Sequence, residues 1–128
     1  MLYTIKVPNR IGNHYNQSSW LLKDHAETLQ FGESLVSALG QTNILLLDGP
    51  LGAGKTSLVK GIAKGLSIKE PITSPTFALS HHYLQGQRAL IHLDLYRLET
   101  HGAADELFLQ EEETAEKLGG LMVVEWPS

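Results

Sequence analysis

The eight residues from 49 to 56, GPLGAGKT, have the residue types and spacing of a phosphate-binding loop, or P-loop. They match the pattern G-x-x-x-x-G-K-[ST], whose glycines allow successive backbone N–H groups to converge on phosphate oxygens. An apolar run precedes the motif and an amphipathic run follows it, which is the strand–loop–helix context that the motif requires. A chance glycine turn before a helix is the alternative, and this context strongly disfavours it.

The positions of this loop have distinct predicted roles toward a nucleoside triphosphate. The start of the following helix adds partial positive charge to the backbone N–H groups. Lys55 would reach the β- and γ-phosphates, and Thr56 would place its hydroxyl on Mg²⁺. The predicted cofactor-binding residues of this segment are Gly49, Gly52, Ala53, Gly54, Lys55, Thr56 and Ser57.

A P-loop also needs an acid on the metal side of the nucleotide, at the end of a neighbouring strand. Asp94 is the best candidate, because it comes late in the apolar run ALIHLDLY, and we predict that it binds Mg²⁺ through water. A surface aspartate at a strand end is the alternative. Asp48 directly precedes the P-loop and is interpreted as structural, or as a lesser metal candidate.

Glu125 is the second unusual acid, because it ends the apolar run LMVV. A glutamate at the C-terminal edge of a central strand faces the ligand crevice of an open α/β sheet, where it could orient or activate the attacking water. From these residues alone, a solvated glutamate at a strand end is an equally favoured alternative.

The segment Thr73–Phe77, TSPTF, follows the P-loop helix, in an interval that often holds a γ-phosphate-sensing loop in P-loop NTPases. Its residues Ser74 and Thr76 could offer hydroxyls to phosphate or metal, and an ordinary proline turn is the alternative.

Other polar residues have simpler interpretations. A hydrogen-bonded strand histidine is favoured over a metal ligand for His92, and a surface pair is favoured over a ligand set for His81-His82. Arg97 is more simply the partner of a nearby acid than an arginine finger in cis. Glu111–Glu113 is most simply a solvated helix face, with a docking surface as the alternative.

The predicted elements alternate between helices and strands. Asp24 followed by Glu27 fits a helix N-cap with its capping-box partner, and Gly40 suits the C-cap. Pro8–Ser18 and Lys69–Thr76 are predicted loops. The predicted helices are Asp24–Leu39, Gly54–Leu66 and Ala103–Leu118, and the predicted strands are Leu2–Val7, Asn43–Asp48, Leu121–Trp126 and the hairpin pair Phe77–Leu84 and Ala89–Tyr96. The continuous apolar strands favour parallel neighbours and covering helices. We therefore expect a three-layer α/β domain of the P-loop NTPase type, with a mixed parallel and antiparallel sheet.

Composition narrows the function classes. The chain has 128 residues, of which 42% are hydrophobic, so it can bury about two thirds of its unfolded surface. It has no cysteine, which excludes disulfides, thiolate zinc sites and cysteine nucleophiles. A net charge of −4 argues against tight, stand-alone nucleic-acid binding. Without a membrane-length apolar run or a signal pattern, we expect a soluble, cytoplasmic protein.

Four motifs, in this order and spacing, resemble the bacterial TsaE family, formerly YjeE: GPLGAGKT (49–56), TSPTF (73–77), HLDLYRL (92–98) and VEWP (124–127). The P-loop alone is generic, whereas the ordered combination of SPTF, DLYR and EW is highly specific. The resemblance implies a small ATPase of tRNA threonylcarbamoyladenosine biosynthesis that binds ATP and Mg²⁺ and hydrolyses ATP slowly alone. It also implies work with TsaB and TsaD, which modify adenosine 37 of tRNA, so that the chain supports their repeated turnover and meets tRNA only indirectly.

The family's functional positions fall on matching residues of this chain. By this resemblance the catalytic residues are Lys55, Asp94 and Glu125, the metal-binding residues are Thr56 and Asp94, and Ser74, Thr76 and Trp126 join the P-loop residues in binding the nucleotide. We expect residues 1–18 to be an N-terminal extension, partly disordered, and residues 19–128 to be a single P-loop ATPase domain. Relatives usually continue after the Glu-Trp motif, so we expect this domain to lack a C-terminal strand segment and to expose a sheet edge.

Two other function classes compete with this one. A small-molecule P-loop kinase shares the P-loop, but such kinases usually clamp two phosphorylated groups with several arginines, and this chain has only Arg10, Arg88 and Arg97. A nucleotide-gated binding module without significant hydrolysis is the second, because conformational coupling requires differential binding rather than turnover.

Overall fold

The computed structural model describes residues 2–8, 15–21, 24–40, 42–48, 55–73, 80–95 and 101–125, with side chains in 24–40, 42–47, 56–73, 80–95 and 102–125. The helices are α1 (His25–Leu39), α2 (Lys55–Gly65) and α3 (His101–Leu118). The strands are β1 (Leu2–Pro8), β2 (Tyr15–Leu21), β3 (Ile44–Asp48), β4 (Ser80–Tyr83), β5 (Leu90–Asp94) and β6 (Leu121–Glu125).

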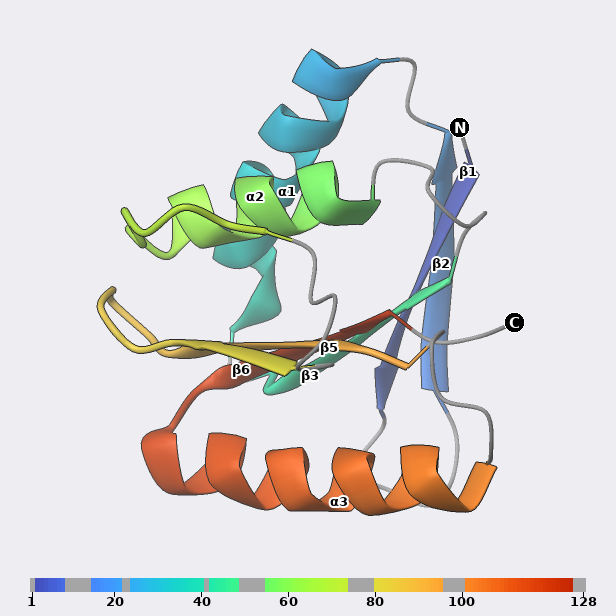
Figure 1. The fold of residues 1–128 in the computed structure, drawn as a ribbon. Coiled ribbons are helices and arrows are strands. Elements are labelled where there is room, and N and C mark those ends of the chain that lie inside the picture. The colour runs from blue at the N-terminus through green and yellow to red at the C-terminus, as the bar shows by residue number, and fades with distance from the viewer. Residues whose placement is uncertain are drawn as a thin grey trace.

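The strands form one sheet in the order β2-β1-β3-β6-β5-β4. The central strands β3, β6 and β5 are parallel, whereas β1, β2 and β4 pair antiparallel on the two sides. Helices α1 and α2 lie on one face of the sheet and α3 lies on the other (Figure 1). The predicted three-layer α/β class with a mixed sheet is confirmed. β3 nevertheless has a parallel neighbour on one side only, because β1 runs antiparallel to it.

The N-terminal residues contribute two strands to this sheet. The prediction of a loop over Pro8–Ser18 is wrong where the structure describes that segment, because Pro8 ends β1 and Tyr15 to Ser18 lie in β2. β2 pairs along its whole length with β1, from Pro8↔Tyr15 to Leu2↔Leu21. Its sequence, YNQSSWL, is largely polar and lacks the apolar alternation that identifies a half-buried strand.

Helix α1 begins where its capping residue predicts. The Oδ1 atom of Asp24 accepts a hydrogen bond from the N–H of Glu27 at 2.8 Å, and its carbonyl accepts one from the hydroxyl of Thr28 at 2.9 Å. At the other end Gly40 has a φ of 56°, a positive value that glycine adopts without the steric penalty of a Cβ atom. The chain can therefore turn directly from α1 toward β3.

The two faces of the sheet carry separate apolar cores. Leu45 of β3 packs with Leu58 and Ile62 of α2 in one core, whereas Leu46 of β3 and Met122 of β6 belong to the core against α3. Successive residues of β3 thus point into opposite cores, as the continuous apolar run predicted. Within the described ranges, no helix is both long enough and apolar enough to cross a membrane.

Two glycines let α1 and α2 pack with their backbones almost in contact. A Cβ built on Gly32 of α1 would lie 2.5 Å from the carbonyl oxygen of Leu58. A Cβ built on Gly61 of α2 would meet the carbonyl oxygen of Leu29 at a distance that real Cβ atoms essentially never show. Because both obstacles are backbone atoms, neither can move without shifting a helix. This contact fixes α2, and with it the residues that follow the P-loop.

We predict that Gly61→Ala lowers the free energy of unfolding by about 2–4 kcal/mol, because the added methyl group must separate the two helices. Gly102→Ala is the matched control, since a Cβ at Gly102 in α3 meets nothing within 4 Å. That change should leave the stability unchanged or raise it by up to about 1 kcal/mol. Chemical denaturation measures both changes, and equal effects of the two substitutions would contradict the close helix contact.

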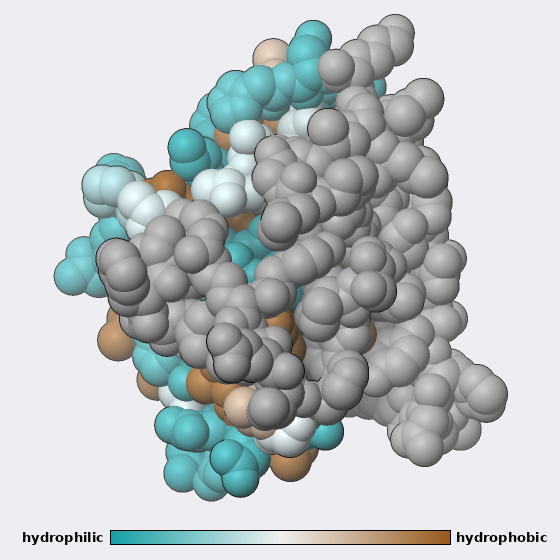
Figure 2. Space-filling model, turned by 45° about the vertical axis from the view of Figure 1, so that its right-hand side comes forward, coloured by the Kyte–Doolittle hydropathy of each residue, from teal (hydrophilic) through white to brown (hydrophobic). Residues whose placement is uncertain are grey.

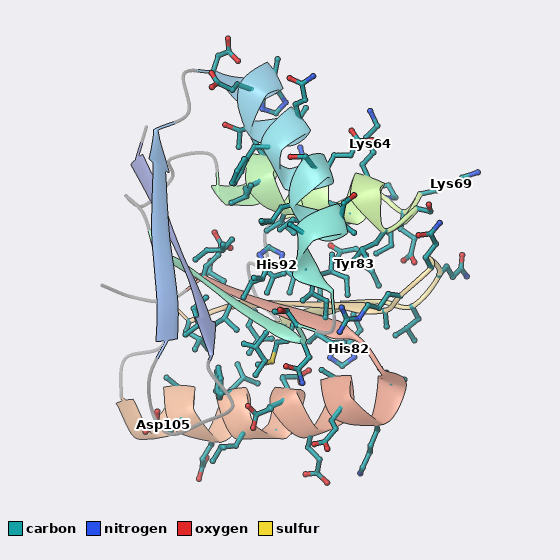
Figure 3. All side chains as sticks on the ribbon, turned by 180° about the vertical axis from the view of Figure 1, so that it is seen from behind. Lys64, Lys69, His82, Tyr83, His92 and Asp105 are labelled. Atoms are coloured by element: carbon teal, nitrogen blue, oxygen red, sulfur yellow. The ribbon has the colours of Figure 1, made fainter. Side chains whose placement is uncertain are left out.

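Helix α3 is joined to the edge strand β4 by a polar pair. His82 Nε2 of β4 and Glu111 Oε2 of α3 are hydrogen-bonded, and the side chain of Glu111 is only 7% exposed. Figure 3 shows His82 between the sheet and α3. The interpretation of Glu111–Glu113 as a solvated face is therefore wrong for Glu111, which lies on the inner side of α3. The outer side does carry hydrophilic residues, which gather along the bottom of the molecule in Figure 2.

We predict that Glu111→Ala lowers the free energy of unfolding by about 1–3 kcal/mol, because the charge-assisted hydrogen bond is lost and a buried gap remains. Glu113→Ala is the control, because Glu113 is exposed and pairs with the equally exposed Lys117 four residues along the helix. Its effect should stay within about 0.5 kcal/mol. Thermal denaturation compares the two variants, and an equal loss of stability in both would argue against the buried pair.

Candidate functional site

The sheet brings the two predicted acids to one edge. In parallel strands β5 and β6, Asp94 lies opposite Glu125, and on the other side of β6, Leu47 of β3 lies opposite Glu125. β3 ends at Asp48 and α2 begins at Lys55, so the P-loop sequence starts at this same carboxyl edge. Ligands of open α/β sheets bind outside this edge.

Both acids are buried on the face of the sheet that α1 and α2 cover. Asp94 is 6% exposed and Glu125 is 5% exposed. Residues of one strand alternate between faces, and Val123 packs in the core beneath α1 and α2, so Glu125 points to that face as well. The alternative of a solvated glutamate at a strand end is therefore not what the structure shows. Two carboxylates side by side repel each other, which favours a cation at this edge.

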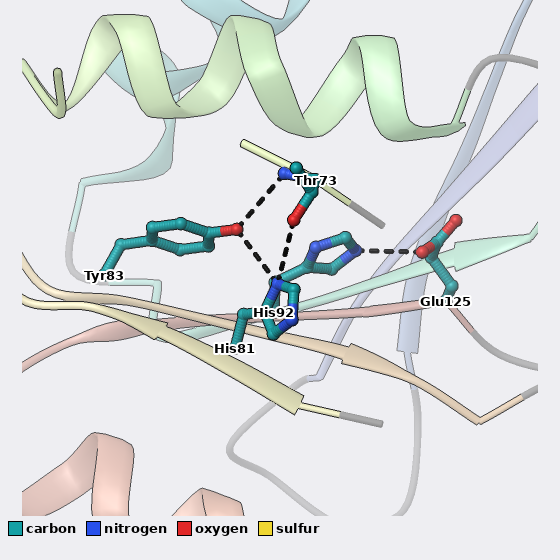
Figure 4. A network of polar contacts seen from close by, with 5 residues as sticks. All are labelled: Thr73, His81, Tyr83, His92 and Glu125. Atoms are coloured by element: carbon teal, nitrogen blue, oxygen red, sulfur yellow. Dashed lines mark hydrogen bonds and ion pairs between the residues drawn. The ribbon is translucent and has the colours of Figure 1, made fainter. Parts of the chain in front are cut away.

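His92 holds one of the two acids. Its Nε2 lies 2.9 Å from Oε2 of Glu125, and the ring is fully buried (Figure 4). The interpretation of His92 as a hydrogen-bonded strand histidine is confirmed. Nowhere in the described residues do three or more histidine, cysteine, aspartate or glutamate side chains form a group that could hold a metal ion by themselves.

The first turn of α2 presents hydroxyl groups. Thr56 and Ser57 are half-buried there, and the Oγ atom of Ser57 lies 2.7 Å from Nδ1 of His25 at the start of α1. Sequence reasoning did not single out His25, because a lone histidine in the first turn of a helix carries no pattern. The contact ties the beginning of α1 to the segment that directly follows the P-loop.

His81 and His82 do not form a surface pair, because adjacent strand residues point to opposite faces. His81 lies on the side of α1 and α2, where its Nδ1 is 3.1 Å from the hydroxyl of Tyr83 and 3.5 Å from Oγ1 of Thr73. The hydroxyl of Tyr83 also accepts a hydrogen bond from the N–H of Thr73 at 3.3 Å. Figure 4 shows this cluster, which fixes the first residue of the TSPTF segment beside the sheet.

Several predicted residues lie outside the described part of the chain, so their placement stays a prediction. They are Gly49, Gly52, Ala53, Gly54, Ser74, Thr76, Arg97 and Trp126, together with the side chains of Asp48 and Lys55. The described site therefore consists of the two buried acids, His92 and the hydroxyls of α2. Oxygen ligands of this kind suit Mg²⁺, and a buried carboxylate at the strand edge can orient a water molecule.

Comparisons with known proteins show which family this chain resembles. The family model for threonylcarbamoyl adenosine biosynthesis protein TsaE matches residues 22–128. A protein of Nostoc sp. named tRNA threonylcarbamoyladenosine biosynthesis protein TsaE is 47% identical over 108 residues, which cover 82% of this chain and 65% of that protein. The protein of the same name from Synechocystis sp. is 42% identical over 113 residues, which cover 88% of this chain and 71% of that protein.

The fold has a counterpart among solved structures. The crystal structure of Bacillus subtilis YdiB matches with a TM-score of 0.59 and 30% sequence identity, and the match covers 84% of this chain and 62% of that one. The chain thus spans about two thirds of the length of these proteins. With a family model that matches from residue 22 to the last residue, and with the acids of the DLYR and EW motifs side by side at one sheet edge, the chain belongs to the TsaE family of tRNA threonylcarbamoyladenosine biosynthesis.

Proposed function

We propose that this chain binds and hydrolyses ATP with Mg²⁺ as a component of the machinery that makes N6-threonylcarbamoyladenosine at position 37 of tRNA. In this proposal its ATP cycle supports repeated turnover of the TsaB–TsaD complex, and tRNA is contacted only through that complex. Membership of the TsaE family supports the pathway, which is threonylcarbamoyladenosine biosynthesis. The two acids beside the P-loop sequence are the reason to expect ATP hydrolysis.

One observation carries the proposal: Asp94 and Glu125 are buried and paired in register at the carboxyl edge of parallel strands, beside the strand that leads into GPLGAGKT. Burying two like charges together is unfavourable unless hydrogen bonds or cations stabilise them, and a nearby cation also reduces their mutual repulsion. A P-loop supplies such cations, namely its lysine and the nucleotide's Mg²⁺.

Each residue has a separate part in this proposal. Lys55 binds the β- and γ-phosphates, and Glu125 orients the attacking water and accepts its proton. Thr56 and Asp94 would hold Mg²⁺, the latter through water, and their hydroxyl and carboxylate oxygens fit that ion. When bound, Mg²⁺ would neutralise negative charge that develops on the phosphate oxygens.

We predict that the chain hydrolyses ATP slowly with Mg²⁺, and faster when TsaB, TsaD and tRNA are added. Lys55→Ala should abolish the stimulated rate, because the lysine supplies the positive charge at the phosphates. Lys60→Ala is the matched control, since Lys60 is exposed on the same helix, and it should keep the rate. An assay of phosphate release measures the hydrolysis rate of the unmodified chain and of both variants, with and without the partners. ATP bound without hydrolysis in either setting would favour the nucleotide-gated binding module instead.

We predict that Glu125→Gln lowers the hydrolysis rate by about 10²- to 10⁴-fold while ATP affinity stays within about threefold, because the amide keeps the shape but cannot accept a proton. Glu113→Gln, on the exposed side of α3, should leave both quantities unchanged. Binding of a fluorescent ATP analogue and phosphate release separate the two effects. An unchanged rate in Glu125→Gln would remove Glu125 from the proposed reaction.

A further inference from the structure

The hydrogen bond between His92 and Glu125 joins Nε2 of the ring to Oε2 of the carboxyl group. A glutamate that accepts a proton in the reaction must first be ionised, and an ionised carboxylate can only accept a hydrogen bond, so in that state the ring donates its Nε2–H. The other ring nitrogen, Nδ1, is buried and has no hydrogen-bond partner in the part of the chain that the structure describes. Within that part, the side-chain hydrogen bonding of His92 is thus directed to Glu125 alone.

The surroundings of His92 do not require a polar side chain for packing. Leu90, Leu121 and Val123 pack on the same face of the sheet, in the core that α1 and α2 cover. A buried hydrogen-bonded pair in such a place generally contributes no more to stability than apolar side chains of the same volume would. The polar pair therefore calls for a reason other than stability.

His92 also stands between Glu125 and the segment proposed to sense the γ-phosphate. It lies directly opposite His81 across the β4–β5 pair, and His81 contacts Thr73, the first residue of TSPTF. Figure 4 shows these residues together beneath α2. His92 thus lies on the strand between Glu125 of β6 and the polar cluster of β4.

We propose that His92 is a positioning residue for ATP hydrolysis, which holds the carboxylate of Glu125 in the orientation that acts on the attacking water. This inference rests on the proposed function, because it assumes that Glu125 takes part in hydrolysis. A glutamate side chain has three rotatable bonds, and the hydrogen bond from Nε2 restricts them to one arrangement. Holding Glu125 in this way raises the fraction of time in which its carboxylate is oriented to act on the attacking water.

Three substitutions of His92 separate positioning from packing. His92→Leu keeps an apolar volume and removes the donor, so kcat should fall roughly 10- to 100-fold with KM within about threefold. The amide nitrogen of glutamine can take the place of Nε2, whereas that of asparagine falls short of it. His92→Gln should therefore recover part of kcat, and His92→Asn should not. If His92→Leu fails to fold, the difference in kcat between His92→Gln and His92→Asn still tests whether a donor at the position of Nε2 is required.

A double variant tests whether His92 acts through Glu125. Adding His92→Leu to Glu125→Gln should lower kcat no further than Glu125→Gln alone, because the group to be positioned is already lost. His82→Leu is the matched control, since His82 is on the other face of the sheet and bonds to Glu111. It should keep kcat, although it lowers the melting temperature. Losses that multiply in the double variant would overturn the inference.

The outcomes also separate this inference from the proposed function. If Glu125→Gln loses its rate while His92→Leu keeps kcat, the positioning role fails and the proposed function stands. If His92→Gln and His92→Asn have the same low kcat as His92→Leu, the donor at Nε2 is not what matters and the inference fails. If the unmodified chain with TsaB, TsaD and tRNA does not hydrolyse ATP, both fail together. If Glu125→Gln keeps the full rate, this inference fails with the proposed role of Glu125, and ATP hydrolysis by the chain stands.

Discussion

The burial of two carboxyl groups side by side is the strongest energetic constraint on this structure. Asp94 and Glu125 lie opposite each other on adjacent strands, and both are almost completely withdrawn from water. Removing a charge from water costs several kcal/mol unless hydrogen bonds or opposite charges replace the lost hydration. His92 supplies one hydrogen bond to Glu125. In the proposed function, Lys55 and a nucleotide-bound cation are of the right charge to stabilise the two acids further.

The rest of the architecture serves to bring these groups to one edge. Parallel pairing of β3, β6 and β5 aligns the ends of three strands, so that the acids and the start of the P-loop sequence come together. The glycine contact between α1 and α2 then fixes the helix that begins directly after the loop. The contact of His25 with Ser57 adds a polar tie at the same end of these helices. Stability and site geometry therefore depend on the same helix pair.

Sequence patterns predicted most of this fold for identifiable reasons. Continuous apolar runs identified β3 and β6, and the Asp24 cap fixed the start of α1 to within one residue. The polar strand β2 was missed because an edge strand with few apolar residues has no periodic signal. Asp94 and Glu125 could be singled out as candidates because a charged residue inside an apolar run is unusual, and the structure buries both. The partners of Glu111 and Glu125 come from distant strands, and no local pattern encodes such pairs.

A crystal structure of this chain with Mg²⁺ and a non-hydrolysable ATP analogue tests the central claim most directly. The account predicts that the γ-phosphate lies at the carboxyl edge of β5 and β6, with Asp94 on the metal side through water. It also predicts that Glu125, still bonded to His92, faces the water in line with the γ-phosphate. A nucleotide bound elsewhere, or a Glu125 side chain turned away from the γ-phosphate, would contradict it.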